Sequence, residues 1–320
     1  MSIRSFLNLV EIRTKAASVI PFTIGTLYAA FHFQQFEWQH FLLMFISMLS
    51  FDMATTVINN YIDFKRAIHT EGYGYTVHNA IVSHGIKEST VRAILVILLV
   101  IAVGTGFLLF LETNLFVLLL GGLSFLVGIL YSFGPIAISR MPLGEIFSGL
   151  FMGFGIIFLA AYIHVEPEQL VALVYEHGLV HIHIDLRELI LIFLVSVPAI
   201  MGIANIMLAN NICDMEEDIV NKRYTLPIYI GKKNALRVFQ WAYAASYLDL
   251  IVLLYLGVNP ILLLLPLLTI RPVRRHVKQF MAVQSKAETF VLAVKNFTQI
   301  NVIRIIVLGG ALLLQGLGMG

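Results

Sequence analysis

Long apolar stretches, each close to the length that crosses a bilayer, recur along this chain of 320 residues. A membrane-spanning helix needs about 20 consecutive apolar residues, and such stretches follow one another here with only short polar connections. Charged residues make up 12% of the chain, well below the ~25% that is usual in a soluble domain. We therefore expect an all-α, polytopic membrane protein whose helices form a bundle around a central cavity.

The apolar stretches are best counted as nine spans. The eighth is short and contains Pro260 and Pro266, so we expect it to be tilted or broken. No linker or low-complexity tract separates the spans, and we expect one membrane domain over residues 1–320. The expected spans are 18–35, 41–59, 92–111, 115–133, 143–163, 188–209, 236–256, 259–271 and 301–318.

The basic residues predict how these spans are oriented. With the N-terminus in the cytoplasm, all of the 21 lysines and arginines except Arg187 fall on the cytoplasmic side. Cytoplasmic loops of membrane proteins carry such an excess, so we expect a multi-pass protein of the cell membrane with a cytoplasmic N-terminus. The net charge of +2 is too small to indicate a nucleic-acid partner. The single cysteine, Cys213, excludes an internal disulfide framework.

Two further patterns predict structure rather than chemistry. Gly149 and Gly153 form a small-xxx-small pair, and the glycines at 121–122 are also expected to allow close helix packing. The longest outer loop, 164–187, contains His-Ile-His-Ile-Asp at 181–185, an alternating spacing that can hold a metal. A surface strand or loop with incidental histidines is the favoured interpretation, and we assign this loop no function.

Two short polar runs interrupt the apolar chain. The first is Asn-Asn-Tyr-Ile-Asp-Phe-Lys-Arg at 59–66, and the second is Asn-Asn-Ile-Cys-Asp-Met-Glu-Glu-Asp at 210–218. They end the second and sixth spans, so the even offset places both runs on the cytoplasmic side and suggests a parallel repeat of four-helix units. Acids and amides at the ends of apolar helices are costly and usually functional.

The spacing within the second run suits a metal site. Asp214 and Asp218 are four residues apart, so a helix presents both on one face, with Asn210 one turn earlier. The first run repeats this spacing. Magnesium prefers oxygen ligands, usually one or two carboxylates with water and phosphate oxygens, so the runs predict a Mg²⁺-bound diphosphate at a membrane surface. The residues expected at the metal are Asn60, Asp63, Asp214 and Asp218.

Cations follow each run directly, where they can take the remaining phosphate charge. The alternative interpretation is a solvated helix end with local ion pairs. The residues expected to bind the diphosphate are Asn59, Asn60, Lys65, Arg66, Asn210, Lys222 and Arg223, and those expected to be catalytic are Asp63, Asp214 and Asp218.

These motifs resemble the UbiA superfamily of intramembrane aromatic prenyltransferases over nearly the whole chain. The second run, with Lys-Arg-Tyr-Thr-Leu following at 222–226, is similar to the second motif of the branch that prenylates 1,4-dihydroxy-2-naphthoate. Leu-Tyr-Ser-Phe-Gly-Pro at 130–135 and Pro-Leu-Gly-Glu-Ile-Phe-Ser-Gly at 142–149 also resemble this branch.

The resemblance implies a nine-helix fold and Mg²⁺-dependent transfer of a polyprenyl group from a polyprenyl diphosphate to 1,4-dihydroxy-2-naphthoate. Loss of CO₂ and diphosphate then gives demethylmenaquinone, a step of menaquinone biosynthesis. For the acceptor we nominate Tyr131, Arg140 and Glu145. For Arg140 a topological anchor, and for Tyr131 an interfacial aromatic, remain equal alternatives. An isoprenyl diphosphate synthase on the cytoplasmic face is a partner that the sequence leaves open.

The first run departs from the family pattern. Asn60 and His69 stand where the family has Asp, Ala67 stands where it has Gly, and Cys213 replaces an Arg. An Asn oxygen still ligates Mg²⁺, whereas imidazole is a poor ligand for so hard an ion. The alternatives left open are another acceptor (hydroxybenzoate, haem or a glycerol phosphate), a non-catalytic isoprenoid or quinone binder, and a transporter. Transporters place their acids near the bilayer midplane, whereas these acids lie at expected helix ends.

Overall fold

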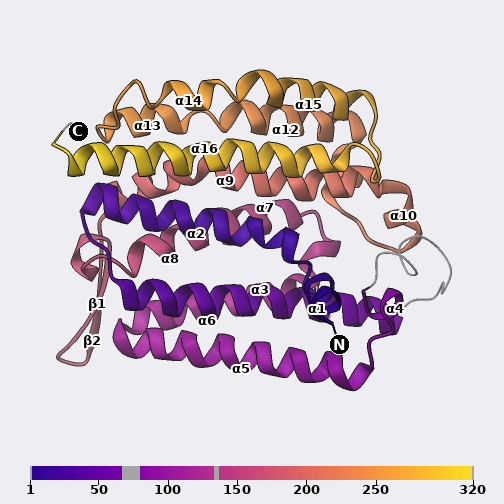
Figure 1. Cartoon of the computed structure of the whole chain (residues 1–320), viewed down its shortest axis with the longest axis horizontal. Helices are drawn as coiled ribbons and strands as arrows, with labels where there is room; N and C mark the ends of the chain where they lie inside the picture. Colours follow the sequence, from indigo (N-terminus) through magenta and orange to yellow (C-terminus); the bar gives the residue numbers. More distant parts are fainter. Residues whose placement is uncertain (1, 67–79, 133–136, 319–320) are drawn as a thin grey trace. The chain divides into compact units, whose positions relative to one another are not determined.

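The computed structural model describes residues 2–66, 80–132 and 137–318, without the side chains of Asp63, Arg66 and Ser132. Within these ranges the chain is mostly helical and has one two-stranded hairpin (Figure 1). Its contacts divide it into two compact units, each of which is described by itself. The expectation of a single domain over residues 1–320 therefore stays a prediction. The units are Met1–Val19 with Gln39–Ser132, and Ile20–Trp38 with Phe133–Gly320.

The first unit is built on three long apolar helices, α3, α5 and α6. The hydroxyl of Ser47 on α3 donates to the carbonyl of Ala102 on α5 over 2.7 Å, and Phe51 on α3 stacks on Phe125 of α6 with ring centroids 3.9 Å apart. Besides the start of α2 (Ala16–Tyr28), its elements are α1 (Ile3–Leu9), η1 (Ile12–Lys15), α3 (Trp38–Arg66), α4 (Ala80–Ser83), α5 (Glu88–Glu112) and α6 (Leu115–Ser132).

The second unit is organised around α9 (Leu186–Cys213), which packs against α7, α8, α12, α13, α16 and the π-helix η5. Figure 1 shows α16 running alongside α9. The other elements are η2 (Ala29–Phe33), η4 (Ile138–Arg140), α7 (Gly144–Ser148), η5 (Gly149–Gly155), α8 (Ile156–Tyr162), η6 (Pro167–Gln169), β1 (Val171–Glu176), β2 (Leu179–Ile184), α10 (Met215–Val220), α11 (Leu226–Ile230), α12 (Lys232–Ala245), α13 (Asp249–Tyr255), α14 (Leu264–Leu267), α15 (Ile270–Ala282) and α16 (Phe290–Gly316).

Glycines bring α7 and η5 close to α9. A Cβ added at Gly153 would lie 2.6 Å from the Cα of Ile200, and one at Gly149 would lie 2.9 Å from the carbonyl oxygen of Ile200. Neither contact is sterically possible, so the expected packing role of this pair is confirmed. The same expectation for 121–122 is wrong, because within the described ranges no atom of another segment lies within 4 Å of a Cβ built there.

Seven helices among the described residues are long and apolar enough to cross a membrane. This confirms an all-α, multi-pass membrane protein, while the count of nine and the orientation of the N-terminus stay predictions. Within the expected span 115–133, Leu115–Tyr131 is a shorter apolar helix. The expected span 259–271 contains only the four-residue helix α14 and the first two residues of α15. The seven are Ile12–Phe33, Trp38–Ile62, Glu88–Glu112, Gly144–Tyr162, Leu186–Cys213, Lys232–Tyr255 and Phe290–Gly316.

The loop expected at 164–187 contains an antiparallel hairpin of β1 and β2. His177 and Gly178 at its tip have positive φ angles of 50° and 79°, as a two-residue type I′ turn requires. Every residue of β2, His181 and His183 included, is exposed. The strand prediction is confirmed, and no group of three His, Cys, Asp or Glu residues suited to a metal occurs in the described part of the chain.

One basic residue occupies a different place from the one its sequence position predicts. Arg304 lies within α16, which begins at Phe290 rather than near 301, and it is 2% exposed. Its Nε and Nη2 donate to the two carboxylate oxygens of Asp249, both over 3.0 Å, and Nη2 also donates to the carbonyl of Ser246 over 2.9 Å. Arg304 is therefore a buried clamp rather than a charge at a membrane surface. The clamp holds α16 to the break between α12 and α13.

Replacing Arg304 with Met leaves the Asp249 carboxylate buried without its partner. Because removing one member of a buried ion pair costs about 3–5 kcal/mol, we expect R304M to lower the Tm in detergent by roughly 10 °C. The double variant D249L/R304M removes both charges and should recover most of that loss. A wild-type Tm for R304M would contradict the clamp.

Candidate active site

The second polar run lies at the end of α9, where the apolar helix gives way to α10. The amide of Asp214 donates to the carbonyl of Asn210 over 3.1 Å, and the amide of Asp218 donates to the carbonyl of Asp214 over 2.8 Å. The helical repeat therefore continues through the junction at Asp214. It places the three polar residues one turn apart, as their spacing predicts.

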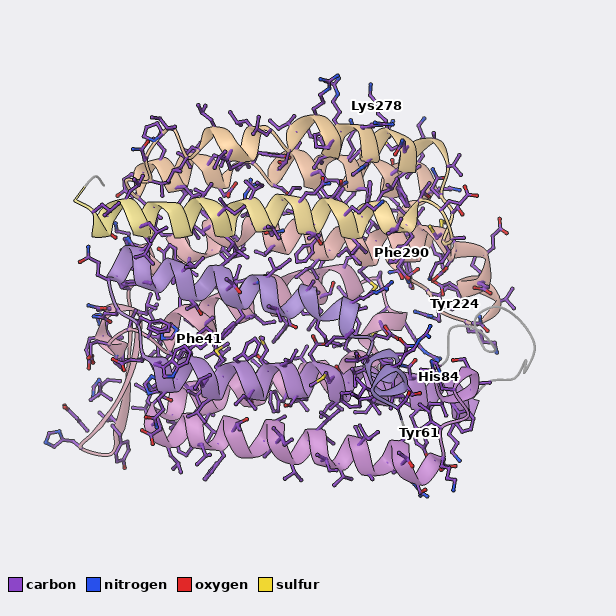
Figure 2. The ribbon with its side chains drawn as sticks, in the orientation of Figure 1. Phe41, Tyr61, His84, Tyr224, Lys278 and Phe290 are labelled. Atoms are coloured by element: carbon purple, nitrogen blue, oxygen red, sulfur yellow. The ribbon has the colours of Figure 1, made fainter. Side chains whose placement is uncertain are left out.

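Asn210 and Asp214 share one cation. Nζ of Lys286, in the loop between α15 and α16, donates to Oδ1 of Asn210 over 2.7 Å and to Oδ2 of Asp214. Nδ2 of Asn210 donates to the same Oδ2 over 3.2 Å. Phe290, labelled in Figure 2, lies 5.9 Å by its ring centroid from this ammonium group. The oxygens of the run therefore gather around a positive charge that the sequence motif alone did not reveal.

Asp218 is the buried acid of the run, at 2% exposure. Nε of Arg223 lies 3.3 Å from its Oδ1, and the hydroxyl of Thr225 donates to its Oδ2 over 3.3 Å. Burial, and secondarily the charge of Asp214, raises the pKa of Asp218, while Arg223 acts in the opposite direction. Arg223 of the basic pair and Thr225 of the Thr-Leu step thus both contact this carboxylate.

Two buried oxygens beside the run have no donor. Nδ2 of Asn211 donates to Oε1 of Glu145 on α7 over 2.9 Å, and Glu145 is 4% exposed. Oε2 of Glu145 and Oδ1 of Asn211 find no hydrogen-bond partner among the described residues. Buried polar atoms are costly without a partner. These two oxygens can accept hydrogen bonds from a bound molecule or from water, or Oε2 of Glu145 can itself be protonated.

Arg140 is held next to the basic pair by backbone contacts. The amide of Tyr224, labelled in Figure 2, donates to the carbonyl of Arg140 over 3.1 Å, and Arg223 reaches the carbonyl of Ser139 at 3.5 Å. Lys222 is exposed and adopts a left-handed φ of 52°. Tyr131 ends α6 in the first unit, so the structure places Arg140 and Glu145, but not Tyr131, in the unit of the second run.

The first polar run ends α3 and belongs to the first unit. Asn60 is 8% exposed, and its Nδ2 donates to the carbonyl of Leu9 over 3.0 Å and to a carboxylate oxygen of Glu11 over 3.3 Å. Glu11 holds a left-handed φ of 47°, which is uncommon outside glycine. The N-terminal segment thus brings to Asn60 a carboxylate that the run itself lacks. Asn59 is exposed.

Lys65 already has a partner in the first unit. Its Nζ donates to one oxygen of Glu88 over 2.9 Å, and the hydroxyl of Tyr61, labelled in Figure 2, donates to the other over 2.6 Å. This hydrogen bond raises the pKa of Lys65. The arrangement matches the interpretation as a local ion pair at a helix end. The side chains of Asp63 and Arg66, and residues 67–79 with Ala67 and His69, lie outside the described residues.

A buried polar cluster in the same unit was not predicted. Nζ of Lys15 donates to Oδ1 of Asp52 over 2.6 Å and to the hydroxyl of Thr56 over 2.7 Å, and Ser18 donates to the other carboxylate oxygen over 2.6 Å. Lys15 is only 4% exposed. The sequence feature that could have indicated this cluster is Asp52, a lone acid inside an apolar span, because such an acid is costly without a partner.

The donor set of the second run fits magnesium. One amide oxygen and one carboxylate oxygen gather around the Lys286 ammonium, with a second carboxylate one turn away. Magnesium is commonly held by one or two carboxylates, while water and phosphate oxygens complete its octahedron. No cluster of three acids, histidines or cysteines occurs among the described residues, so the oxygens of this run would fill only part of such a coordination sphere.

The sequence pattern of the UbiA prenyltransferase family matches residues 18–293. The chain belongs to this family. It is therefore a prenyltransferase, and the resemblance found in its motifs is confirmed. The 1,4-dihydroxy-2-naphthoate octaprenyltransferase of Bacillus subtilis (strain 168) is 31% identical over 291 residues, which cover 90% of this chain and 85% of that protein.

Solved structures of other proteins share the fold of this chain. A UbiA homolog from Aeropyrum pernix K1, in its apo form, has a TM-score of 0.65 at 18% identity and covers 95% of this chain and 98% of its own. A UbiA homolog from Archaeoglobus fulgidus bound to DMAPP and Mg²⁺ has a TM-score of 0.62 at 15% identity and covers 96% and 99%. At such identities the likeness establishes the fold alone.

Replacing Lys286 with Met removes the ammonium that a metal would have to displace from Asp214. An exposed ion pair contributes up to about 1 kcal/mol, so we expect K286M to bind Mg²⁺ roughly fivefold more tightly in the absence of diphosphate, as measured by titration calorimetry. K295M removes an exposed lysine of α16 and should leave the affinity unchanged. Weaker binding by K286M would contradict this account of Lys286.

Proposed function

We propose that this prenyltransferase transfers a polyprenyl group from a polyprenyl diphosphate to 1,4-dihydroxy-2-naphthoate in a Mg²⁺-dependent reaction. CO₂ and diphosphate leave, and demethylmenaquinone forms. The proposal extends to this chain the activity of the Bacillus subtilis relative, which is 31% identical. It places the active site on the cytoplasmic side of the cell membrane, where the basic residues of the second run gather, and treats residues 1–320 as one domain.

The observation that carries the proposal is the gathering of Asn210 and Asp214 around the ammonium of Lys286. This point already attracts a cation and presents oxygen ligands at the end of an apolar helix. Among the structural neighbours, a UbiA homolog from Archaeoglobus fulgidus is bound to Mg²⁺ and DMAPP. We infer that Asp214 and Asp218 take part in holding Mg²⁺ with the diphosphate in this chain, and that Asn210 orients them.

Each residue of the second run has a separate role in this proposal. Asp214 would hold the metal in place of Lys286, whose ammonium would then be free to pair with phosphate oxygens. Arg223 and Lys222 balance the negative charge of the leaving group, which is electrostatic stabilisation by a preorganised site. When bound, Mg²⁺ supplies Lewis-acid stabilisation of the departing diphosphate. The surrounding apolar helices exclude water from the allylic carbon.

Glu145 and Asn211 supply the acceptor end of the site. Two of their oxygens accept no hydrogen bond within the described residues. Each can accept one from a hydroxyl group of a dihydroxynaphthoate ring. Arg140, whose carbonyl accepts from the amide of Tyr224 next to Arg223, is proposed to pair with the acceptor carboxylate. Tyr131 stays a candidate from the sequence alone.

The first run is proposed to serve the same diphosphate. Asn59, Asn60, Asp63, Lys65 and Arg66 keep their expected roles as part of this proposal, with Asn60 and Asp63 at the metal. Glu11, which reaches Asn60, restores one acid to a run that carries fewer acids than its family pattern. Lys65 joins the diphosphate only by leaving its ion pair with Glu88.

The direct test is prenyl transfer by the purified protein in detergent. We expect demethylmenaquinone from an all-trans polyprenyl diphosphate, 1,4-dihydroxy-2-naphthoate and Mg²⁺, and no product in EDTA. Asp214→Asn should lower the rate by about 100-fold or more. Glu216→Gln, an exposed acid two positions away, is the matched control and should retain activity.

Two outcomes would contradict the proposal. Equal rates for D214N and E216Q would show that the second run is not the metal site. Product with a hydroxybenzoate but not with the naphthoate would keep the reaction and replace the acceptor.

Replacing Glu145 with Gln exchanges one acceptor oxygen of the carboxylate for an NH₂ group, which can only donate. Because one lost buried hydrogen bond costs about 1–1.5 kcal/mol, we expect the KM for the naphthoate to rise about tenfold and the KM for the diphosphate to stay near wild type. Glu168→Gln, in an exposed turn, is the control. A tenfold rise for the diphosphate with no change for the naphthoate would assign Glu145 to the other substrate.

A further inference from the structure

The helix α15 separates an apolar face from a strongly basic one. Val273, Val277 and Phe280 are buried in the core cluster that α15 shares with α9, α12 and α16. On the other side, cations occur at positions i, i+3, i+4 and i+7, which is the spacing of one helix face. These four exposed residues, the α15 basic face, are Arg271, Arg274, Arg275 and Lys278.

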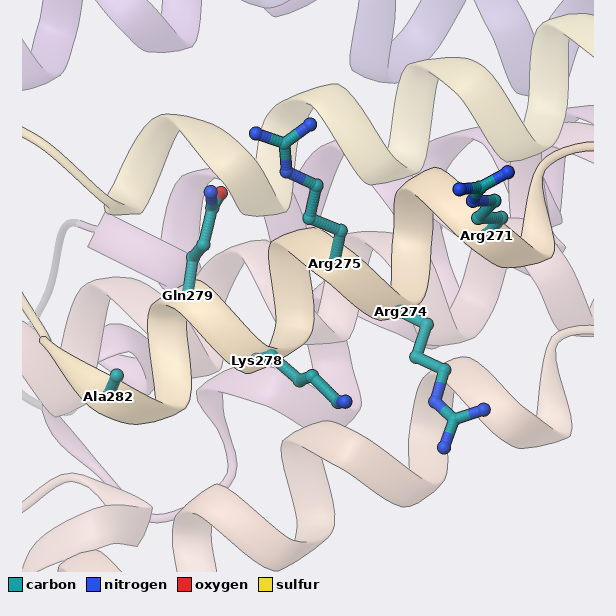
Figure 3. Close-up of a pocket in the computed structure, with 6 residues that line it drawn as sticks. All are labelled: Arg271, Arg274, Arg275, Lys278, Gln279 and Ala282. Carbon is teal, nitrogen blue, oxygen red and sulfur yellow. The ribbon is translucent and has the colours of Figure 1, made fainter.

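The basic face encloses a shallow hollow. Its volume is about 640 Å³, and Gln279 and Ala282 complete its lining. In Figure 3, Arg271 and Arg275 point to one side of α15, while Arg274 and Lys278 point to the other. Lys278 also projects away from the ribbon in Figure 2. The guanidinium and ammonium groups thus form two rows along α15, and an anion can bind between the rows or beside either one.

The sequence on either side of α15 contains very few acids. From residue 219 to residue 287 the only acidic residue is Asp249, which Arg304 engages within the core. The helices packed against α15 are α12 and α16, and neither contains Asp or Glu. None of the ion pairs among the described residues involves the basic face. Its four charges are therefore not neutralised by an ion pair within the described residues.

The position of α15 indicates which kind of partner suits this face. Both α12 and α16 belong to helices long and apolar enough to cross the membrane, so α15, which packs against both, is held at the membrane. Unpaired cations are costly against hydrocarbon, but long basic side chains extend to the headgroup layer. Clusters of Lys and Arg at the headgroup layer bind anionic lipids. Arginine also holds phosphate by paired hydrogen bonds.

We propose that the α15 basic face is a binding site for anionic phospholipid headgroups, separate from the residues assigned to catalysis. The phosphate lies in the hollow between the two rows of cations, and the acyl chains run along the apolar surface of the adjoining helices. The site depends on the protein being membrane-embedded, and not on the identity of its substrates.

The test is native mass spectrometry of the full chain in neutral detergent, titrated with phosphatidylglycerol or phosphatidylcholine. The wild type should retain phosphatidylglycerol in preference to phosphatidylcholine. Removing two cations, in R274Q/K278Q or in R271Q/R275Q, should weaken phosphatidylglycerol binding by roughly fivefold per charge. The charge-retaining variant R274K/R275K should keep most of the affinity.

The matched control is R4Q/R13Q, which removes two exposed cations from the other unit and should bind as the wild type does. Undiminished phosphatidylglycerol binding by both α15 variants, or equal binding of the two lipids by the wild type, would overturn the proposal. Displacement of the lipid by millimolar inorganic phosphate would overturn it too, because the site would then be one for free phosphate. A wild-type Tm for each variant shows that a loss of binding is not a loss of folding.

Discussion

A charged or polar side chain in an apolar span must meet a partner within the protein or reach the membrane surface, and the structure of this chain follows from that constraint. Lys15 and Asp52 pair in one unit, and Arg304 and Asp249 pair in the other. In each of these pairs the two opposite charges neutralise each other. The sites proposed for function are those where polar groups of the described chain lack a partner, namely the buried oxygens of Glu145 and Asn211 beside the second run and the exposed cations of α15.

Close packing at α9 connects the fold to the chemistry. Gly149 and Gly153 let η5 approach the backbone of α9 at Ile200, and the same helix pair continues into the contact between Glu145 and Asn211. Further along, α9 ends where its polar residues meet Lys286. The helix α9 thus carries the packing interface, Asn211 of the polar pair and Asn210 at the start of the second run, so that a disturbance of its packing would move all three.

Much of the fold and part of the site could be predicted from sequence, because apolar length and the i, i+4 spacing of Asp214 and Asp218 depend only on local periodicity. What could not be predicted depends on contacts between distant segments. Lys286 lies in no motif, yet the loop before α16 brings it to Asp214, and Glu11 reaches Asn60 only because the chain turns at its left-handed φ. Arg304 was misplaced because its helix begins earlier than the apolar stretch around it suggests.

The most direct test of the account is the structure of the full chain with Mn²⁺ and a non-hydrolysable polyprenyl diphosphate analogue, with the metal located by anomalous scattering. The account predicts a Mn²⁺ peak within coordination distance of Asp214, with the diphosphate beside it and Lys286 moved from the carboxylate to a phosphate oxygen. A diphosphate bound elsewhere, with Lys286 still on Asp214 and no metal at the end of α9, would contradict it.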